Sequence, residues 1–345
     1  MGTLRFLLAI AVVLQHVGQI GPFQFVDAGV AVFSFFIISG FYMSLVLNTK
    51  YVGPGSVPTF YINRYVRLWP TYAISLVFMF IAMWKINSLP GLVSTLKLFP
   101  GEWTFAVLFS NLSLVGLDLF THISLGPEGV AFAEAGRSQV HNGNTFIFNM
   151  PAWTIWIEMM FYLVAPFVVR SFRATLLFMM VGVGFALSLR VLPQELIGQY
   201  RYDLYYPYFL PFFGIGALVF WFSRTELPAS AVAYFFMLLG TLAFLAAPLH
   251  YGSSFYLVLA LAIPKLFELT KNIRLDKFVG DLSYPVYILH WPVHSLVAPY
   301  DFLPSKPVQT LLATLGLGII VVVLVERPIA RIRERWTVRK IQRIM

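Results

Sequence analysis

The stretch that decides the fold stands at the start of the chain, where residues 5–16 read RFLLAIAVVLQH. Ten uncharged, mostly apolar residues separate Arg5 from His16, which is typical of a helix inside a membrane. A helix turns about 100° and rises about 1.5 Å per residue, so both side chains return to one face about 16 Å apart. The pattern predicts a membrane-spanning helix with a cation near one end and an imidazole near the other.

The composition extends this prediction to the whole chain. Of the 345 residues, 59% are hydrophobic and 11% are charged, whereas a soluble domain carries about 25% charged residues. So few charges exclude a water-soluble surface and indicate an all-α polytopic membrane protein. The absence of cysteine excludes disulfides, thiolate metal sites and a cysteine nucleophile. The net charge of +9 comes from basic residues between apolar segments, which indicates membrane topology rather than nucleic-acid binding.

Apolar segments along the chain predict about ten transmembrane helices in one bundle, which forms a single membrane domain over residues 1–345. They lie at 4–21, 28–48, 68–86, 152–170, 174–192, 206–222, 231–248, 253–269, 283–300 and 308–326. A shorter apolar segment at 103–117 is predicted not to span, because counting it would break the distribution of positive charge.

The positive-inside rule sets the expected orientation, with both termini cytoplasmic. Basic residues then gather in the cytoplasmic connections and in a basic tail, 327–345. The outward connections keep only scattered basic residues, such as Lys85, Lys97, Arg137, Arg201 and Lys306. Segment 87–151, between the third and fourth spans, becomes a long external segment. It far exceeds the 2–8 residues usual between bundled helices, so we expect it to be functional.

Ionisable side chains inside the spans mark the candidate site, because burying them in a membrane is costly. His16 and Glu158 fall at a similar depth toward the outside, and His290 falls near the middle of the ninth span. The alternative is that each of these polar residues only pairs with another to hold the bundle together.

Three arginines fall at the predicted cytoplasmic ends of the spans. They are Arg5, Arg64 and Arg67, the last two just before Pro70, which is expected to open the third span. Spaced three residues apart, Arg64 and Arg67 can share a helix face. Basic residues at inner span ends also serve as ordinary topology signals. Taken together with His16 and Glu158, they predict a path that binds anionic groups at the inner face and performs chemistry nearer the outside.

Several motifs resemble the membrane acyltransferase family three, in order along nearly the whole chain. RFLLAIAVVLQH matches that family's R-x10-H signature, and the others are FFIISGFYMS (35–44), NRYVRLWPTY (63–72), WTIWIEMMFYLVAP (153–166), LSYPVYILHWPV (282–293) and VERP (325–328). One position departs from the pattern: many members carry an acid just before the FF of the second span, where this chain has Phe33, and Asp27 lies earlier.

The resemblance implies transfer of an acyl group, often acetyl, from cytoplasmic acyl-coenzyme A (acyl-CoA) to extracytoplasmic glycans or small molecules. It implies a multi-pass protein of the cell (inner) membrane, with acyl-CoA as co-substrate and no cofactor or metal. The expected partners are the bilayer, acyl-CoA and a glycan or lipid-linked saccharide, with no nucleic acid. Because the chain ends soon after the tenth span, we expect no fused extracellular esterase-like domain.

The resemblance also implies roles for the residues. His16 is the expected general base, Glu158 orients His16 or stabilises its imidazolium, and Arg5 acts beside them as a third catalytic residue. Together with Arg5, the predicted substrate-binding residues Arg64 and Arg67 would bind the coenzyme A phosphates. A covalent acyl-enzyme on His16 or Ser39 is an alternative. The further predicted substrate-binding residues are Ser39, Tyr72, Trp153, Tyr284 and His290.

Two other functions stay open at this point. A transporter or flippase for lipid-linked glycans would also line a cavity with charges, but it would move substrate without an acyl donor. An acyltransferase could instead act on a small-molecule acceptor at the cytoplasmic side. Residues that could contact a sugar on the outside are Trp103, Asp118, His122, Glu128, His141 and the tyrosine-rich stretch 199–208.

Overall fold

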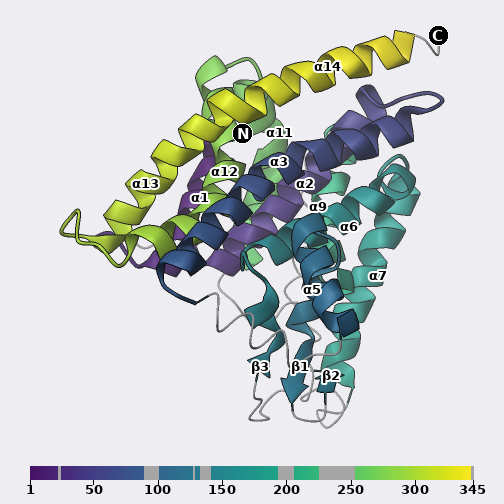
Figure 1. Cartoon of the computed structure of the whole chain (residues 1–345). Helices are drawn as coiled ribbons and strands as arrows, with labels where there is room; N and C mark the ends of the chain where they lie inside the picture. The colour runs from purple at the N-terminus through teal and green to yellow at the C-terminus, as the bar shows by residue number, and fades with distance from the viewer. Residues whose placement is uncertain are drawn as a thin grey trace.

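The computed structural model describes residues 1–21, 25–88, 101–126, 129–132, 141–192, 206–224 and 253–342. Figure 1 shows a bundle of long helices with a small sheet at one end. The helices are α1 Gly2–Val17, α2 Ala28–Thr49, α3 Ser56–Lys85, α5 Gly101–Ser113, α6 Ala152–Val168, α7 Phe172–Val191, α9 Tyr206–Phe222, α11 Ser253–Thr270, α12 Arg274–Val297, α13 Lys306–Val321 and α14 Arg327–Gln342.

The helices agree with the apolar segments of the sequence. Each predicted span within the described residues coincides with a helix, and the span predicted at 231–248 lies outside them. Among the described residues, four helical segments are long and apolar enough to cross a membrane: Ala28–Thr49, Ser56–Lys85, Phe172–Leu189 and Lys306–Arg335. The protein is therefore a helical, multi-pass membrane protein. The count of ten crossings and the cytoplasmic placement of both termini stay predictions.

Helix α3 differs from the prediction at its start. It begins at Ser56 and runs to Lys85, so Pro70 lies inside the helix instead of opening it. Proline inside a membrane helix is tolerated because neighbouring groups satisfy the freed carbonyl. Arg64 and Arg67 consequently project from the body of α3, where their three-residue spacing puts them on neighbouring positions of one face.

Close backbone contact between α2 and α9 depends on glycine. A Cβ atom on Gly40 of α2 would collide with the carbonyl of Phe213, and one on Gly216 of α9 would collide with the carbonyl of Ile37. Small residues at such crossings let membrane helices approach closely, which strengthens their van der Waals packing. This contact fixes the position of Ser39, the residue next to Gly40, relative to the rest of the bundle.

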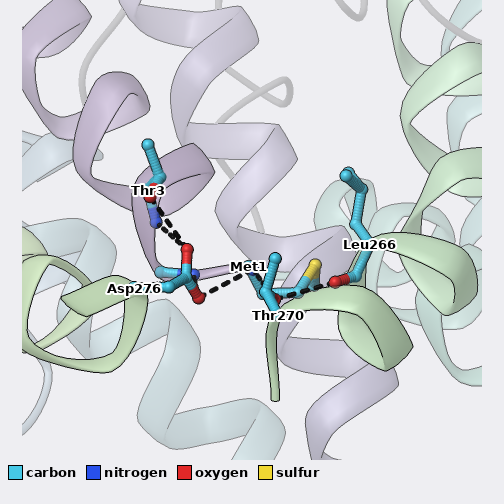
Figure 2. Close-up of polar contacts among 6 residues, drawn as sticks. Met1, Thr3, Leu266, Thr270 and Asp276 are labelled. Carbon is cyan, nitrogen blue, oxygen red and sulfur yellow. Dashed lines mark hydrogen bonds and ion pairs between the residues drawn. The ribbon is translucent and has the colours of Figure 1, made fainter. Parts of the chain in front are cut away.

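The start of α1 is fixed by Asp276 of α12. Figure 2 shows the Asp276 carboxylate receiving hydrogen bonds from the terminal ammonium of Met1 at 3.0 Å and from the amide of Thr3 at 2.9 Å. The amide of Gly2 and the hydroxyl of Thr3 also donate to it, each at 2.8 Å, and the Met1 ammonium additionally donates to the Thr270 hydroxyl. A carboxylate at this position satisfies amides that no helical carbonyl can reach. Asp276 therefore sets the depth and direction of α1.

The same contacts determine the ionisation of Asp276, which precedes the predicted span 283–300. Burial raises the pKa of its carboxyl, but the Thr3 and Gly2 amides and the terminal ammonium lower it more. The pKa therefore lies well below its ordinary value, and Asp276 is charged at neutral pH.

The described residues of segment 87–151 form a small subdomain that the all-helical prediction did not include. It combines α5, two short helices, η1 Leu117–Thr121 and η2 Gly143–Phe146, and a three-stranded antiparallel sheet in the order β2-β1-β3. The strands are β1 Ile123–Gly126, β2 Gly129–Phe132 and β3 His141–Asn142. Figure 1 shows the sheet at the end of the molecule away from both chain termini.

A π-helical turn joins α13 to α14. The turn, η4, covers Val322–Glu326, and α14 continues from it as one long helical edge of the molecule (Figure 1). Turns of this type insert extra backbone into a helix and occur frequently at functional sites. The turn contains Glu326 of the VERP motif, which accepts a hydrogen bond from the Thr71 hydroxyl of α3 at 2.8 Å.

Candidate functional site

A cavity of about 440 Å³ lies among α1, α2, α3, α6 and α12, and we call it the main cavity. One end is formed by the first turns of α1 and α12, including Gly2 and Asp276, and we call it the inner end because the predicted orientation puts it on the cytoplasmic side. Its outer end reaches Thr154 of α6 and Tyr287 of α12. A volume of this size falls in the range of small-molecule sites.

The three predicted arginines meet at the inner part of the main cavity, where Arg5, Arg64 and Arg67 all line the wall. The Arg5 and Arg67 guanidinium groups make no hydrogen bond or salt bridge to the described residues. Arg64 stacks over Phe60 at 5.4 Å and Tyr162 at 5.8 Å, and its buried Nε lacks a hydrogen-bond acceptor among the described residues. Buried cations without acceptors are costly, so this cluster is suited to an anionic ligand.

Ser39, Glu158 and Tyr162 form a hydrogen-bonded group in the cavity wall. The Ser39 hydroxyl donates to Glu158 Oε1 at 2.8 Å, and the Tyr162 hydroxyl donates to the same oxygen at 2.5 Å. Glu158 Oε2 makes no hydrogen bond to the described residues. The carboxylate is thus held by two donors and keeps one oxygen available to accept another.

His16 lies outside the main cavity, paired with His290. His16 Nδ1 and His290 Nε2 are 3.0 Å apart, and the two rings are nearly parallel, with centroids 5.2 Å apart. The ring of Trp291 meets His16 edge-on at 5.7 Å. The structure therefore does not bring Glu158 to His16: Glu158 bonds to Ser39 and Tyr162, and His16 bonds to His290.

The hydrogen-bond chain assigns the protons of the histidine pair. His290 Nδ1 lies 2.6 Å from the carbonyl oxygen of Tyr287, which can only accept, so Nδ1 carries the hydrogen. In neutral His290, Nε2 is then the acceptor, and His16 Nδ1 must donate to it. His16 is left with an unprotonated Nε2 on an exposed side chain. The pair thus fixes His16 in the form that can remove a proton.

Tyr287 connects the two regions. Its side chain lines the outer end of the main cavity, and its hydroxyl lies 2.6 Å from the Thr154 hydroxyl. Its carbonyl, one helical turn before His290, accepts the hydrogen bond described above. The structure therefore does not put Arg5 and His16 in one cavity: Arg5 lines the main cavity and His16 does not, whereas Tyr287 lines the cavity and its ring also meets that of His290 at 6.3 Å.

The other predicted substrate-binding residues separate into two groups. Tyr284 lines the main cavity, with its hydroxyl bonded to the Leu68 carbonyl at 2.7 Å. Tyr72 is fully buried and bonds to the Asn111 carbonyl at 2.6 Å, which connects α3 to α5 instead of facing the cavity. Trp153 packs against Phe209, outside the main cavity.

Phe33, the position where the sequence departs from the expected motif pattern, lies in an aromatic cluster. Its ring stacks on Phe212 at 4.5 Å and contacts Phe36, Phe209 and Tyr256. Asp27 caps α2 by accepting a hydrogen bond from the Gly29 amide at 2.7 Å.

In segment 87–151, the residues considered for sugar contact lie in different environments. Asp118 and His122 are buried. Burial raises the pKa of Asp118, although a hydrogen bond from Trp156 acts against this. Trp103 is half-buried. Glu128, most of the stretch 199–208 and the side chain of His141 lie outside what the structure describes.

Several residues of the site were not singled out from the sequence. They are Tyr42, Thr154, Tyr162, Lys271, Lys277, Asp281 and Tyr287. Tyr162 follows Glu158 by four residues, and Tyr287 precedes His290 by three. Both spacings put side chains on one helix face and could have identified these partners.

Comparison with known proteins gives the family. A sequence model described as an acyltransferase domain, that of acyltransferase family 3, matches residues 2–327. The chain belongs to acyltransferase family 3. The match covers α1 through the start of α14, so the main cavity and the histidine pair both lie inside the family domain. No curated protein and no solved structure matches the chain. The protein is an acyltransferase of the membrane.

Proposed function

We propose that the protein transfers an acyl group, acetyl in the first instance, from cytoplasmic acyl-CoA to a hydroxyl of an extracytoplasmic glycan. The observation that carries this proposal is the cluster of Arg5, Arg64 and Arg67, whose side chains line one cavity with few protein acceptors among the described residues. Guanidinium forks match phosphate oxygens, and coenzyme A carries a diphosphate. Its pantetheine arm would extend along the main cavity toward Thr154 and Tyr287.

In the proposed reaction, His16 Nε2 takes the proton of the acceptor hydroxyl as the hydroxyl oxygen attacks the thioester carbonyl carbon. The carbon–sulfur bond then breaks, the new ester leaves with the acceptor, and the coenzyme A thiolate takes up the proton from the His16 imidazolium. His290 Nε2 continues to accept from His16 Nδ1 throughout, so the ring keeps its orientation. For the two substrates to meet, the Thr154–Tyr287 pair has to admit the thioester or move aside.

An acceptor on the outer side is supported by the surroundings of His16. The ring is exposed, and Trp291 beside it offers an apolar face of the kind that packs on a sugar ring. The subdomain formed by 87–151 lies at the end of the molecule away from the termini (Figure 1).

A covalent route through Ser39 is a second candidate mechanism, favoured by the 2.8 Å hydrogen bond from Ser39 to Glu158 in the main cavity. Glu158 would take the hydroxyl proton while Ser39 Oγ attacks the thioester carbonyl, the carbon–sulfur bond would break, and the coenzyme A thiolate would take the proton from Glu158 as it leaves. The acceptor hydroxyl would then attack the Ser39 ester, and its proton would return to Ser39 Oγ. Incubation with acyl-CoA and no acceptor, followed by peptide mass spectrometry, distinguishes the routes. Acyl-Ser39 supports the covalent route, and an unmodified peptide with normal turnover supports direct transfer.

The transfer itself is tested in inside-out membrane vesicles. Acetyl-CoA is supplied outside, a polysaccharide or lipid-linked saccharide is enclosed in the lumen, and released coenzyme A is measured with a thiol reagent. The chain has no cysteine, so its own side chains give no background. Acetylated product in the lumen supports the proposal. Saccharide movement without donor would indicate a flippase, and product only on the donor side would indicate a cytoplasmic small-molecule acceptor.

A further inference from the structure

A second cavity, of about 500 Å³, lies among α3, α12, η4 and the first turns of α14, and we call it the tail cleft. Its wall is strongly basic, with six basic against three acidic side chains. The basic residues are Arg67, Arg274, Lys277, Arg327, Arg331 and Arg333, and the acidic ones are Asp281, Glu326 and Glu334. Most of these basic residues lie outside the sequence motifs quoted above. Those motifs therefore do not explain the positive charge of the cleft.

Two of the cations are held by the protein itself. The Arg327 guanidinium lies over the ring of Phe278 at 4.9 Å, and Arg333 donates to the carbonyl of Asn63 at 3.1 Å. These contacts fix the start of α14 against α12 and α3. They stabilise the cleft and leave the remaining cations to a ligand.

The remaining cations have no such partners. Arg67, Arg274, Lys277 and Arg331 make no hydrogen bond or salt bridge to the described residues, and the last three are exposed. They come from three different helices and line one hollow. Like charges gathered in this way repel one another, and an anion bound between them would remove the repulsion.

The tail cleft shares part of its wall with the main cavity. Arg67, Lys277, Asp281 and Tyr284 line both, so a single long ligand could extend from one space to the other past Arg67. Coenzyme A has this form, with a diphosphate on one side of a ribose and a phosphate monoester on the other. A phosphate monoester carries close to two negative charges at neutral pH and suits several basic side chains at once.

We propose that the tail cleft binds the 3′-phosphate end of the donor, with Arg331 and Lys277 as the residues that recognise the phosphate. This inference rests on the proposed use of acyl-CoA and adds that the nucleotide lies against α14. It gives the start of the basic tail a substrate-binding role in addition to its value as a topology signal.

The experiment compares two donors that differ only in that phosphate, acetyl-CoA and acetyl-3′-dephospho-CoA, in neutral-lipid nanodiscs. The wild type is expected to show a KM about tenfold to a hundredfold lower for acetyl-CoA, the effect of losing one charge-assisted contact. In Arg331→Ala, the KM for acetyl-CoA is expected to rise while that for the dephospho donor stays unchanged, so the discrimination collapses. In Lys277→Ala, whose residue also lines the main cavity, the KM for acetyl-CoA is expected to rise more than that for the dephospho donor. The unchanged dephospho donor also shows that the Arg331→Ala variant is folded.

Arg335→Ala is the matched control, because Arg335 is an exposed arginine of α14 that does not line the tail cleft. It should keep the full discrimination between donors. The inference is overturned if Arg331→Ala and Lys277→Ala raise the KM of both donors equally, or of neither, or if Arg335→Ala matches them.

The same donor comparison distinguishes nucleotide binding from lipid binding in the tail cleft. If the variants matter only in nanodiscs containing anionic lipid, and equally for both donors, the cleft binds a lipid phosphate and the inference fails. If the wild type uses both donors equally well, acyl transfer stands and only the tail-cleft assignment fails. If the wild type uses neither donor, the proposed function is wrong, and this inference, which depends on it, is wrong as well.

Discussion

The inner and outer ends of the α1–α12 pair use the same two helices for different purposes. At the inner end, Asp276 fixes the start of α1, and Arg5 faces a cavity lined by further cations. At the outer end, His16 and His290 bond directly to each other, and the ring of His16 is exposed. The inner end has charge with few acceptors among the described residues, whereas the outer end has a fully assigned hydrogen-bond chain.

This difference separates binding from chemistry along one helix pair. An unpaired guanidinium attracts an anion but cannot remove a proton at neutral pH, because arginine stays protonated. A neutral histidine with a fixed tautomer can remove a proton but adds little affinity for phosphate. Substitutions at the two ends should therefore change different kinetic constants.

The division between an inner binding end and an outer catalytic end requires that the two ends of α12 face opposite sides of the membrane. Labelling of single cysteines at these ends tests this, and each position is expected to be either labelled or unlabelled. Asn272 lies in the turn before α12, and Phe302 lies in the exposed connection after it. In intact cells, an impermeant maleimide should label Phe302→Cys and leave Asn272→Cys unlabelled. The cysteine-free chain is the blank, and permeabilised cells should label at both positions.

The same labelling tests the external segment. Thr145, which follows the sheet and is exposed, should behave like Phe302 when replaced by cysteine. Labelling of position 272 without 302 would reverse the orientation of the whole bundle. Labelling of 302 without 145 would put segment 87–151 on the cytoplasmic side.

The largest kinetic effect is expected at the outer end. His16→Ala should lower turnover by about 10²–10⁴-fold, the range of a lost general base, while donor affinity stays near that of the wild type. Turnover and acyl-CoA binding are measured on the same purified sample.

Gln15→Ala is the control, since Gln15 is exposed and points about 100° away from His16 on α1. It should retain activity. Substantial turnover by a folded His16→Ala protein would remove His16 from the chemistry, and an inactive Gln15→Ala protein would show that local packing, not the imidazole, is what matters.

A smaller effect is expected at His290, which acts through His16. His290→Leu should lower kcat by about tenfold to a hundredfold, because His16 Nδ1 loses its acceptor and the ring can adopt the wrong tautomer. His290→Gln should recover part of this loss, since an amide oxygen can accept from His16 and its NH2 group can donate. The ¹⁵N resonances of labelled histidine report the His16 tautomer directly. Equal activity of the two variants, or an unchanged tautomer in His290→Leu, would leave His290 with packing alone.

Much of the helical bundle could be predicted, because membrane helices leave long apolar runs in the sequence. The sequence did not show that α3 continues without a break through Pro70. Proline lacks an amide hydrogen, and packed neighbours compensate for the backbone hydrogen bond that is lost. The small sheet was also missed, because its strands are only two to four residues long. Patterns this short carry too little periodicity to identify a strand.

The sequence predicted many residues of the candidate site, but it did not predict which of them form hydrogen bonds with one another. The motifs identified Arg5, Arg64 and Arg67, which do share one cavity. They did not show that Glu158 bonds to Ser39, because depth along a span says nothing about which face of a helix a side chain occupies. Tyr72 belongs to a motif, yet its hydroxyl donates to the carbonyl of Asn111 in α5. Only the three-dimensional structure reveals this partner.

The smallest effect is expected at the inner end. Arg67→Ala should raise the KM for acyl-CoA by about tenfold with a much smaller change in kcat, because it removes a phosphate contact made equally in the ground and transition states. Arg67→Lys should recover only part of the affinity, since an ammonium keeps the charge but loses the bidentate fork.

Lys50→Ala is the control, because Lys50 is an exposed cation that does not line the main cavity. Direct measurement of donor binding by calorimetry separates affinity from turnover. An unchanged KM for Arg67→Ala, or a loss of kcat as large as that of His16→Ala, would contradict the division of labour between the two ends. In the first case the inner arginines act only as topology signals, and in the second they act in the chemistry itself.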